Sequence, residues 1–306
     1  MNTLPLDITE FSSSVLAVPP LARRGDLSLD IAQNAKLIRH IEAGGHKTLL
    51  YGGNANVYHC STSDYAQLIE MLAAHSAAGT RVIPAIGPDF GKMMDQARLL
   101  RGTDYKTAMV LPMQGFTSSD GVVAGISRFV DFTGIPVTLY LKSESYLELE
   151  ALGRLVDEGR VIAVKYAVVR PDPVEDPYLQ ALVERITLAR VVSGMGERPA
   201  LVHLSRFGLA SFTTGSGCIA PRASMRLLHA LKHREVSEAE ALHARFMPLE
   251  DLRESISLIR VLHDAVTLSG IADMGAHLPL LSACPPESLP RIQAEVDALL
   301  AFEQGL

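Results

Sequence analysis

Short, almost continuously apolar segments recur along the first two thirds of the chain. They are rich in Val, Ile, Leu and Thr, and they begin at Ser14, Lys47, Arg81, Thr107, Pro136, Val161, Leu188 and Leu209. Strands that are buried on both faces of a parallel sheet have this composition, whereas strands with one solvent-exposed face alternate apolar and polar residues. The pattern therefore predicts eight buried, parallel strands.

Amphipathic segments separate these predicted strands. In LDIAQNAKLIRHIEAGG, Ile31, Leu37, Ile38 and Ile41 recur near helical spacing before the two glycines that end the segment. The segment SDYAQLIEMLAAHSAAG predicts a second helix, capped by Ser63. Similar helices are predicted from DGVVAGISRFVDFTG, SYLELEALGRLVDEG, DPYLQALVERI and RPALVHLSRFG. Eight alternating strand and helix units favour a (β/α)8 TIM barrel, and a doubly wound sheet is the alternative.

The last part of the chain has a different, entirely helical pattern. It contains four helical segments, PRASMRLLHALKH, SEAEALHARF, LEDLRESISLIRVLHDAV and PESLPRIQAEVDALLAF. We expect the first of them to close the barrel and the others to form a C-terminal helical appendage. The predicted division is a (β/α)8 barrel over residues 1–230 and a C-terminal helical extension over residues 231–306.

Composition and charge narrow the class of protein. The chain has 306 residues, of which 48% are hydrophobic and 20% charged, and its net charge is −6. This favours one large soluble domain without nucleic acid as a partner. No apolar run approaches the ~18 residues of a membrane span, and the N-terminus does not resemble a signal peptide. Cys60, Cys218 and Cys284 lack metal-finger spacing, so we expect a reducing, cytoplasmic setting and no metal.

Glycine-rich and histidine motifs give only weak signals. GPDFGKMM lacks the spacing and the hydroxyl residue of a P-loop. GSGCIA, residues 215–220, matches a dinucleotide-binding pattern, but a tight turn that needs small residues is the favoured interpretation. His40, His46, His59, His203 and His229 form no metal-protease motif, and we interpret them as surface or hydrogen-bonded core residues.

The segment VIAVKYAV places Lys165 inside an apolar run. In a barrel, Lys165 falls in the carboxyl-terminal half of the sixth strand, and Tyr140 falls at the same level of the fifth. A lysine that points into the barrel is desolvated, which lowers its pKa and frees the amine as a nucleophile. The phenol can then transfer protons. A lysine that points outward, with its ammonium group in water, is the alternative, and composition does not decide between them.

Several segments around Lys165 and Tyr140 resemble a known family. GIPVTLY, VIAVKYA, DYAQLIEMLAAHSAAGTRVIPAIG, FTTGSGCIAPRASMRLLHAL and HLPLL are similar, in order and spacing, to motifs of the dihydrodipicolinate synthase / N-acetylneuraminate lyase superfamily of class I, Schiff-base aldolases. The resemblance extends from about Ser14 to Ser282. It implies that Lys165 forms the Schiff base, that Tyr140 is the acid/base, and that Thr213 lies beside the substrate.

Other positions depart from the family's pattern. The family's GTTGE loop, which holds the carboxylate of the substrate, corresponds here to GGNAN, so Gly52, Gly53 and Asn54 are the implied binding residues. Ser145 stands where the synthase has a carboxylate-binding arginine. Gln114, which the resemblance implies as a further substrate-binding residue, stands where the family has a tyrosine that a neighbouring subunit supplies to the proton relay. The chain is therefore not expected to be dihydrodipicolinate synthase itself.

The resemblance implies a Schiff-base-forming lyase that acts on a small-molecule 2-oxo acid, as a homotetramer or homodimer and without a cofactor. Two alternatives remain open: a dehydratase of 2-oxo-3-deoxy sugar acids, and a non-catalytic barrel that binds a 2-oxo acid or has a regulatory role. Glu197 and Arg198 lie in a loop at the expected barrel mouth, where Arg198 is a hypothetical ligand for a distal acid group. Arg170 and His59 are further candidates of the same kind.

Overall fold

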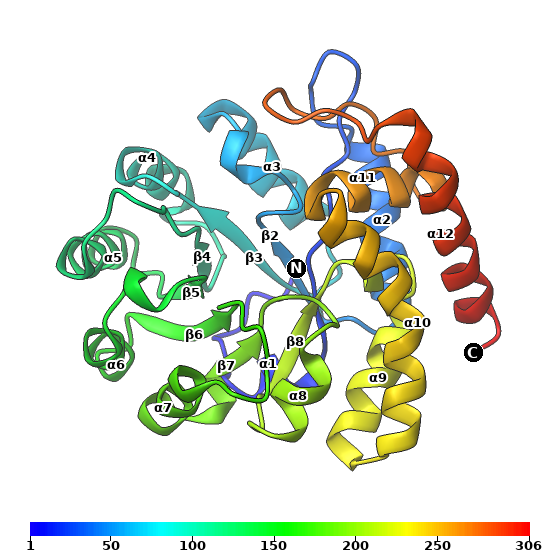
Figure 1. Cartoon of the computed structure of the whole chain (residues 1–306). Helices are drawn as coiled ribbons and strands as arrows, with labels where there is room; N and C mark the ends of the chain where they lie inside the picture. Colours follow the sequence, from blue (N-terminus) through cyan, green and yellow to red (C-terminus); the bar gives the residue numbers. More distant parts are fainter.

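A computed structural model describes residues 1–306 and has eight parallel strands that form one closed barrel in chain order. The last strand pairs with the first, which excludes the doubly wound sheet and confirms the (β/α)8 prediction. Figure 1 shows the ring of strands inside a ring of helices. The strands are β1 Leu16–Ala17, β2 Thr48–Tyr51, β3 Arg81–Ile86, β4 Ala108–Val110, β5 Val137–Leu141, β6 Val161–Tyr166, β7 Val191–Ser193 and β8 Ser211–Thr214.

One helix follows each strand and covers the outside of the barrel. After the short N-terminal α1, Glu10–Ser13, these helices are α2 Ile31–Ala43, α3 Thr62–His75, α4 Phe90–Leu100, α5 Ser119–Thr133, α6 Leu149–Asp157, α7 Pro177–Ile186, α8 Ala200–Ser205 and α9 Pro221–His233. Every residue of β2, β3, β4, β7 and β8 is buried, as the continuous apolar runs predict for strands enclosed on both faces.

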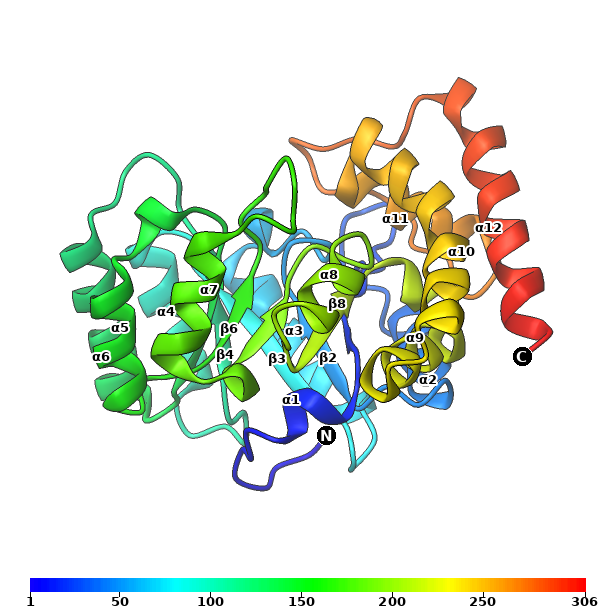
Figure 2. The same cartoon turned by 60° about the horizontal axis from the view of Figure 1, so that its bottom comes forward.

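Three further helices, α10 Val236–Ser255, α11 Leu258–Leu268 and α12 Leu289–Gln304, form the predicted C-terminal extension. Figures 1 and 2 show these helices grouped on one side of the barrel, next to α9 and α2. Helix α10 packs on α9, and α12 packs on both α9 and α10. The division of the chain at residue 230 stays a prediction. None of the helices is both long and apolar enough to span a membrane.

Three details differ from the expectations. The cap of α3 is Ser61 rather than Ser63, because the Ser61 side chain accepts the Asp64 amide hydrogen at 3.1 Å. Helix α4 was not predicted, although Asp89 caps it and Met93, Ala97 and Leu100 form its buried face. Helix α10 continues through Pro248, and the chain breaks at Ser257, whose side chain caps α11.

Candidate active site

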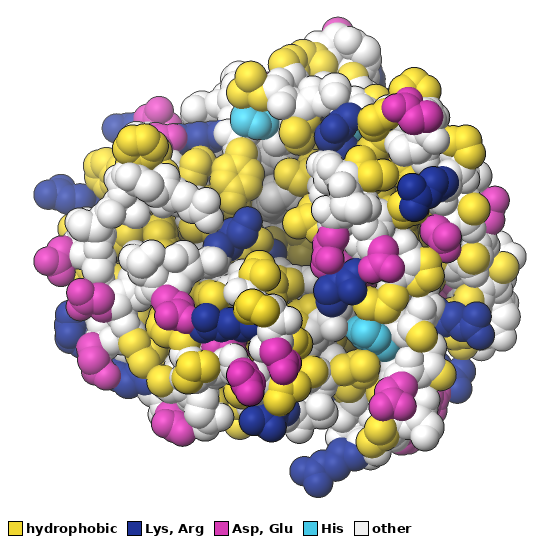
Figure 3. All heavy atoms as spheres, in the orientation of Figure 1, with side chains coloured by type: hydrophobic (Ala, Val, Ile, Leu, Met, Phe, Trp, Pro, Cys, Tyr) yellow, Lys and Arg dark blue, Asp and Glu magenta, His cyan; other side chains and the backbone are white.

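A cavity of about 550 Å³ opens at the carboxyl ends of the barrel strands. Its wall includes Lys165 from β6, Tyr140 from β5, Thr213 from β8 and the loops that follow β2 and β7. This is the end of a barrel at which active sites lie. Figure 3 shows the same face hollowed near its centre, with basic and acidic side chains around the opening.

The Lys165 side chain points into the barrel. Lys165 is only 4% exposed and lines the cavity, whereas the next residue, Tyr166, points outward to the helix layer. The Tyr166 hydroxyl donates to the Asp176 carboxylate at 2.6 Å, and Asp176 caps α7. Because successive side chains of a strand alternate between its faces, this outward anchor keeps Lys165 directed inward. The inward alternative left open by the sequence is therefore the one observed.

Lys165 and Tyr140 are cross-strand neighbours in the register of β5 and β6. The Lys165 amine lies 3.9 Å from the centroid of the Tyr140 ring. Contact with a ring face favours the ammonium form. Burial, by contrast, disfavours the charged ammonium form. Burial and the positive charges of Lys142 and Arg253 together lower the pKa of Lys165 to about 7. A large fraction of the amine is then neutral near neutral pH, as a nucleophile requires.

The absence of a side chain at Gly194 leaves space for Lys165. A β-carbon at this position, directly after β7, would lie 2.8 Å from Cγ of Lys165 and 2.7 Å from the Tyr166 carbonyl oxygen. Any larger residue would therefore displace the lysine or the strand. Gly194, the first residue of the loop after β7, thus has a packing role at the site.

The Tyr140 hydroxyl keeps its proton at neutral pH. Burial and the nearby Tyr58 raise the pKa of Tyr140 well above its usual value. A protonated phenol beside a neutral amine can donate to the oxygen that leaves when an imine forms. Tyr58, which precedes α3 in a short 3-10 helix, Val57–His59, was not singled out from the sequence.

The GGNAN loop after β2 places two of its residues at the cavity. Gly53 and Asn54 line it, while Gly52 is buried behind them, where a β-carbon would lie 2.5 Å from the Met109 methyl group. The Asn54 amide group donates to the Val18 carbonyl at 2.8 Å, which ties the loop to the end of β1. The backbone N–H groups of Gly53, Asn54 and Ala55 have no partner within the protein.

The other residues named from the sequence occupy different places. Thr213 is buried and lines the cavity, whereas Gln114 is exposed on the loop after β4 and is not part of its wall. Arg198 lines the rim, where it pairs with Asp251 and Glu254. Arg170 also lines the cavity and pairs with Glu144 and Asp176, and His59 is exposed.

The GSGCIA segment forms a tight, buried turn whose polar groups hydrogen-bond to neighbouring parts of the protein. Its residues Ser216–Cys218 make a 3-10 helix, in which the Gly217 amide donates to the Thr214 hydroxyl at 2.6 Å and Ser216 donates to Glu250. These groups are engaged within the protein, which accords with the tight-turn interpretation.

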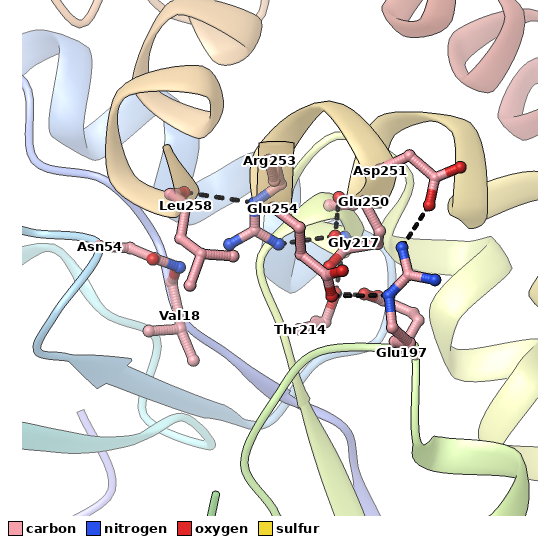
Figure 4. Close-up of polar contacts among 12 residues, drawn as sticks. Val18, Asn54, Glu197, Thr214, Gly217, Glu250, Asp251, Arg253, Glu254 and Leu258 are labelled. Carbon is pink, nitrogen blue, oxygen red and sulfur yellow. Dashed lines mark hydrogen bonds and ion pairs between the residues drawn. The ribbon is translucent and has the colours of Figure 1, made fainter. Parts of the chain in front are cut away.

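A buried ionic cluster, missed by the sequence analysis, adjoins the cavity and is drawn in Figure 4. Arg253 on α10 donates to Glu250 at 2.6 Å, and Thr214 donates to Glu197. Burial and the negative charge of Glu250 raise the pKa of Glu197 to about 8. We infer that Glu197 is mostly protonated at pH 7, while Glu250 is the counter-ion of Arg253.

Histidines make a second cluster that the sequence did not indicate. Ligand atoms of His263, Asp264 and His277 all lie within 4.8 Å of one another. The groups are satisfied internally: Asp264 accepts from His277 at 2.7 Å and from the Cys284 amide at 2.8 Å. Two other histidines are buried: His46 bonds Ser224, and His203, at the cavity, bonds Ser193.

These features together define a (β/α)8-barrel protein whose cavity holds a buried lysine next to a phenol. A sequence model of the dihydrodipicolinate synthetase family matches residues 12–297, so the chain belongs to that family. The family expected from the resemblance is thereby confirmed. The enzyme class expected with it, a lyase of the class I aldolase type, is confirmed as well.

Comparisons with curated proteins give distant relatives over almost the whole chain. A probable 5-dehydro-4-deoxyglucarate dehydratase of Rhizobium rhizogenes is 24% identical, over 97% of this chain and 99% of the relative. A 4-hydroxy-tetrahydrodipicolinate synthase of Mycolicibacterium paratuberculosis is 22% identical, over 97% of this chain and 98% of that protein.

Solved structures of the family have the same fold. Dihydrodipicolinate synthase from Bacillus clausii superposes with a TM-score of 0.83 at 18% identity, covering 97% of this chain and 100% of the other. A prophage protein of the same family from E. coli K12, solved in complex with pyruvate, gives a TM-score of 0.80 at 17% identity, covering 94% and 98% of the two chains.

The raised pKa of Glu197 predicts a specific pH dependence of stability. Between pH 4.5, its ordinary pKa, and about 8, the folded state holds a proton that the unfolded state has lost, so this group stabilises the fold less as the pH rises. Glu197→Gln removes the effect. We therefore expect its thermal midpoint, relative to that of the unmodified protein, to rise by several degrees between pH 5 and pH 8.

Differential scanning calorimetry across this range measures the difference. Glu254→Gln removes one carboxylate at the exposed rim and serves as the matched control. If the difference in thermal midpoint between Glu197→Gln and the unmodified protein stays constant from pH 5 to pH 8, the protonated state assigned to Glu197 is contradicted.

Proposed function

We propose that the protein is a Schiff-base lyase in which Lys165 condenses with a 2-oxo acid and Tyr140 transfers the protons. The observation that carries this proposal is Lys165, which is 4% exposed, has a pKa of about 7 and has its amine 3.9 Å from the centroid of the Tyr140 ring. Gly53, Asn54 and Thr213 are the proposed substrate-binding residues, with Gly52 supporting the loop.

The chemistry assigns separate roles to the two residues. The Lys165 nitrogen attacks C2 of the 2-oxo acid and forms a carbinolamine, and the oxygen then leaves as water with a proton from Tyr140. The resulting iminium withdraws electrons from the bond two carbons away. When a base removes the proton of the C4 hydroxyl group, the C3–C4 bond breaks into an enamine and an aldehyde, which is an aldol cleavage. When a base removes a C3 proton instead, the resulting enamine expels the C4 hydroxyl group, which leaves as water after it takes up a proton, and the reaction is a dehydration. No bound metal or organic cofactor is required for these steps.

The second candidate function is the dehydratase of 2-oxo-3-deoxy sugar acids. Two relatives, from Streptomyces coelicolor and Rhizobium rhizogenes, are named probable 5-dehydro-4-deoxyglucarate dehydratases. A cavity of about 550 Å³ is also large for a three-carbon acid and suits a sugar acid. Gly53 and Asn54 in place of the family's two threonines, and Gln114 in place of its tyrosine, argue against the dihydrodipicolinate synthase reaction.

We also propose a homodimer or homotetramer in a reducing, cytoplasmic setting. Gln114 and the 85%-exposed Phe116 lie on the same loop after β4, which suits contact with a second copy of the chain. Cys60, Cys218 and Cys284 are buried and unpaired, which accords with a reducing compartment.

A trapping experiment tests imine formation. Incubation with pyruvate and cyanoborohydride is expected to give one stable covalent adduct on Lys165, detected by intact-mass and peptide-mass spectrometry. Lys165→Ala should give no adduct, whereas Lys142→Ala, which removes the neighbouring amine at the cavity wall, should still give it. An equal adduct on Lys165→Ala would refute the assignment of the nucleophile.

Removal of the Tyr140 hydroxyl tests the proton transfer. Tyr140→Phe is expected to slow imine formation and turnover by at least ~100-fold, as is usual when a general acid is lost. Folding should be almost unchanged because the ring is kept. Tyr146→Phe is the control, since this buried phenol does not line the cavity. Equal single-turnover trapping rates for both variants would exclude Tyr140 as the acid.

Product analysis distinguishes the candidate reactions. With a six-carbon 2-oxo-3-deoxy sugar acid, an aldolase releases pyruvate, which lactate dehydrogenase detects, whereas a dehydratase gives a product lighter by one water. We expect one of these products from the unmodified protein and none from Lys165→Ala. A panel of 2-oxo acids that differ in length and charge tests the third possibility. If the protein forms trapped adducts with these acids but converts none of them, the non-catalytic, binding role is favoured.

A further inference from the structure

Arg253 presents an unused hydrogen-bond donor to the cavity. Its side chain comes from α10, is 5% exposed and lines the cavity beside Lys165, Asn54 and Thr213. Nε donates to the Leu258 carbonyl at 3.3 Å and Nη1 donates to Glu250 at 2.6 Å, while Nη2 has no partner in the protein. A buried guanidinium normally uses its donors, so an unpaired terminal nitrogen at a cavity wall indicates a place for an anion.

The position of this guanidinium is fixed by its surroundings. A β-carbon at Gly215, directly after β8, would lie 2.6 Å from both terminal nitrogens, so a larger residue there would displace the guanidinium from this position. Figure 4 shows one terminal nitrogen of Arg253 directed to Glu250 and the other directed to the side on which Val18, Asn54 and Leu258 lie. Glu250 is itself held by Ser216. The donor is therefore oriented before any ligand arrives.

The loop after β2 has backbone donors but no side-chain hydroxyl group. The N–H groups of Gly53, Asn54 and Ala55 are unpaired, and the Asn54 side chain already bonds Val18. Successive backbone N–H groups can bind an anion such as a carboxylate. A guanidinium adds a charge-assisted bond of planar geometry that matches a carboxylate.

We propose that Arg253 binds the C1 carboxylate of the substrate through Nη2, together with the backbone N–H groups of Gly53 and Asn54. This inference rests on the proposed function, because it places the carboxylate next to the ketone that Lys165 attacks. The position suits C1 because Arg253, Lys165 and the loop that carries Gly53 and Asn54 line the same cavity. Arg198, in contrast, is at the rim and already pairs with two carboxylates.

A binding measurement that needs no covalent chemistry tests the proposal. In the Lys165→Ala background, NMR titration gives the affinities for pyruvate and for pyruvamide, which keeps the ketone but has no charge. We expect pyruvate to bind at least tenfold more tightly, as one charge-assisted hydrogen bond provides. The preference should disappear when Arg253→Met and Glu250→Gln are added together, a pair of changes that leaves no buried unpaired charge.

Two further variants keep the result interpretable. Arg245→Met makes the same substitution at an exposed position of α10 outside the cavity and should keep the preference. Arg253→Lys keeps the positive charge but lacks the planar guanidinium group, so this variant should keep part of the preference for pyruvate. Circular dichroism and thermal midpoints establish that each variant is folded, and Arg253→Lys serves alone if the double change does not fold.

The outcomes separate this inference from the proposed function. Equal affinity for the two ligands in the Lys165→Ala background, or an unchanged preference without Arg253, would overturn the role of Arg253. Either result leaves imine trapping by the unmodified protein unaffected. Failure of trapping with a preserved, Arg253-dependent preference for pyruvate would instead overturn the Schiff-base chemistry alone.

Discussion

The site depends on one costly arrangement, a lysine amine kept almost without water inside the barrel. A buried amine loses hydration that a single aromatic ring face does not replace, and the loss destabilises the charged form. The chain keeps the amine inside by means of the strand alternation that sends Tyr166 outward to Asp176. Gly194 provides the space that the lysine stem needs. The energetic cost of burial is thus what makes the amine reactive.

The C-terminal helices complete the cavity rather than only covering the barrel. Helix α10 supplies Glu250 and Arg253, and α11 begins with Leu258, all at the cavity wall. Glu250 and Arg253 add charged groups to a cavity wall to which the strands contribute Tyr140, Lys165 and Thr213. In this chain they provide the cationic donor next to the GGNAN loop, where threonine hydroxyl groups are lacking.

The sequence predicted the barrel, Lys165 and Tyr140 because their signals are local. Buried parallel strands are continuous apolar runs, and a lysine within such a run is conspicuous. Arg253 and Glu250 could not be found in this way, since they look like ordinary charged residues of an amphipathic helix and meet the cavity only after α10 packs on α9. The local pattern also predicted a helix break near Pro248, where α10 in fact continues. The break lies at Ser257, whose side chain caps α11.

The ionisation of the Lys165 amine tests this account most directly. Lysine labelled with carbon-13 at the ε-carbon reports the pKa by NMR titration of the intact protein, and the signal that disappears in Lys165→Ala gives the assignment. The account predicts a pKa of about 7. A value near the ordinary 10.5 would show an amine in contact with water and would contradict the proposed chemistry.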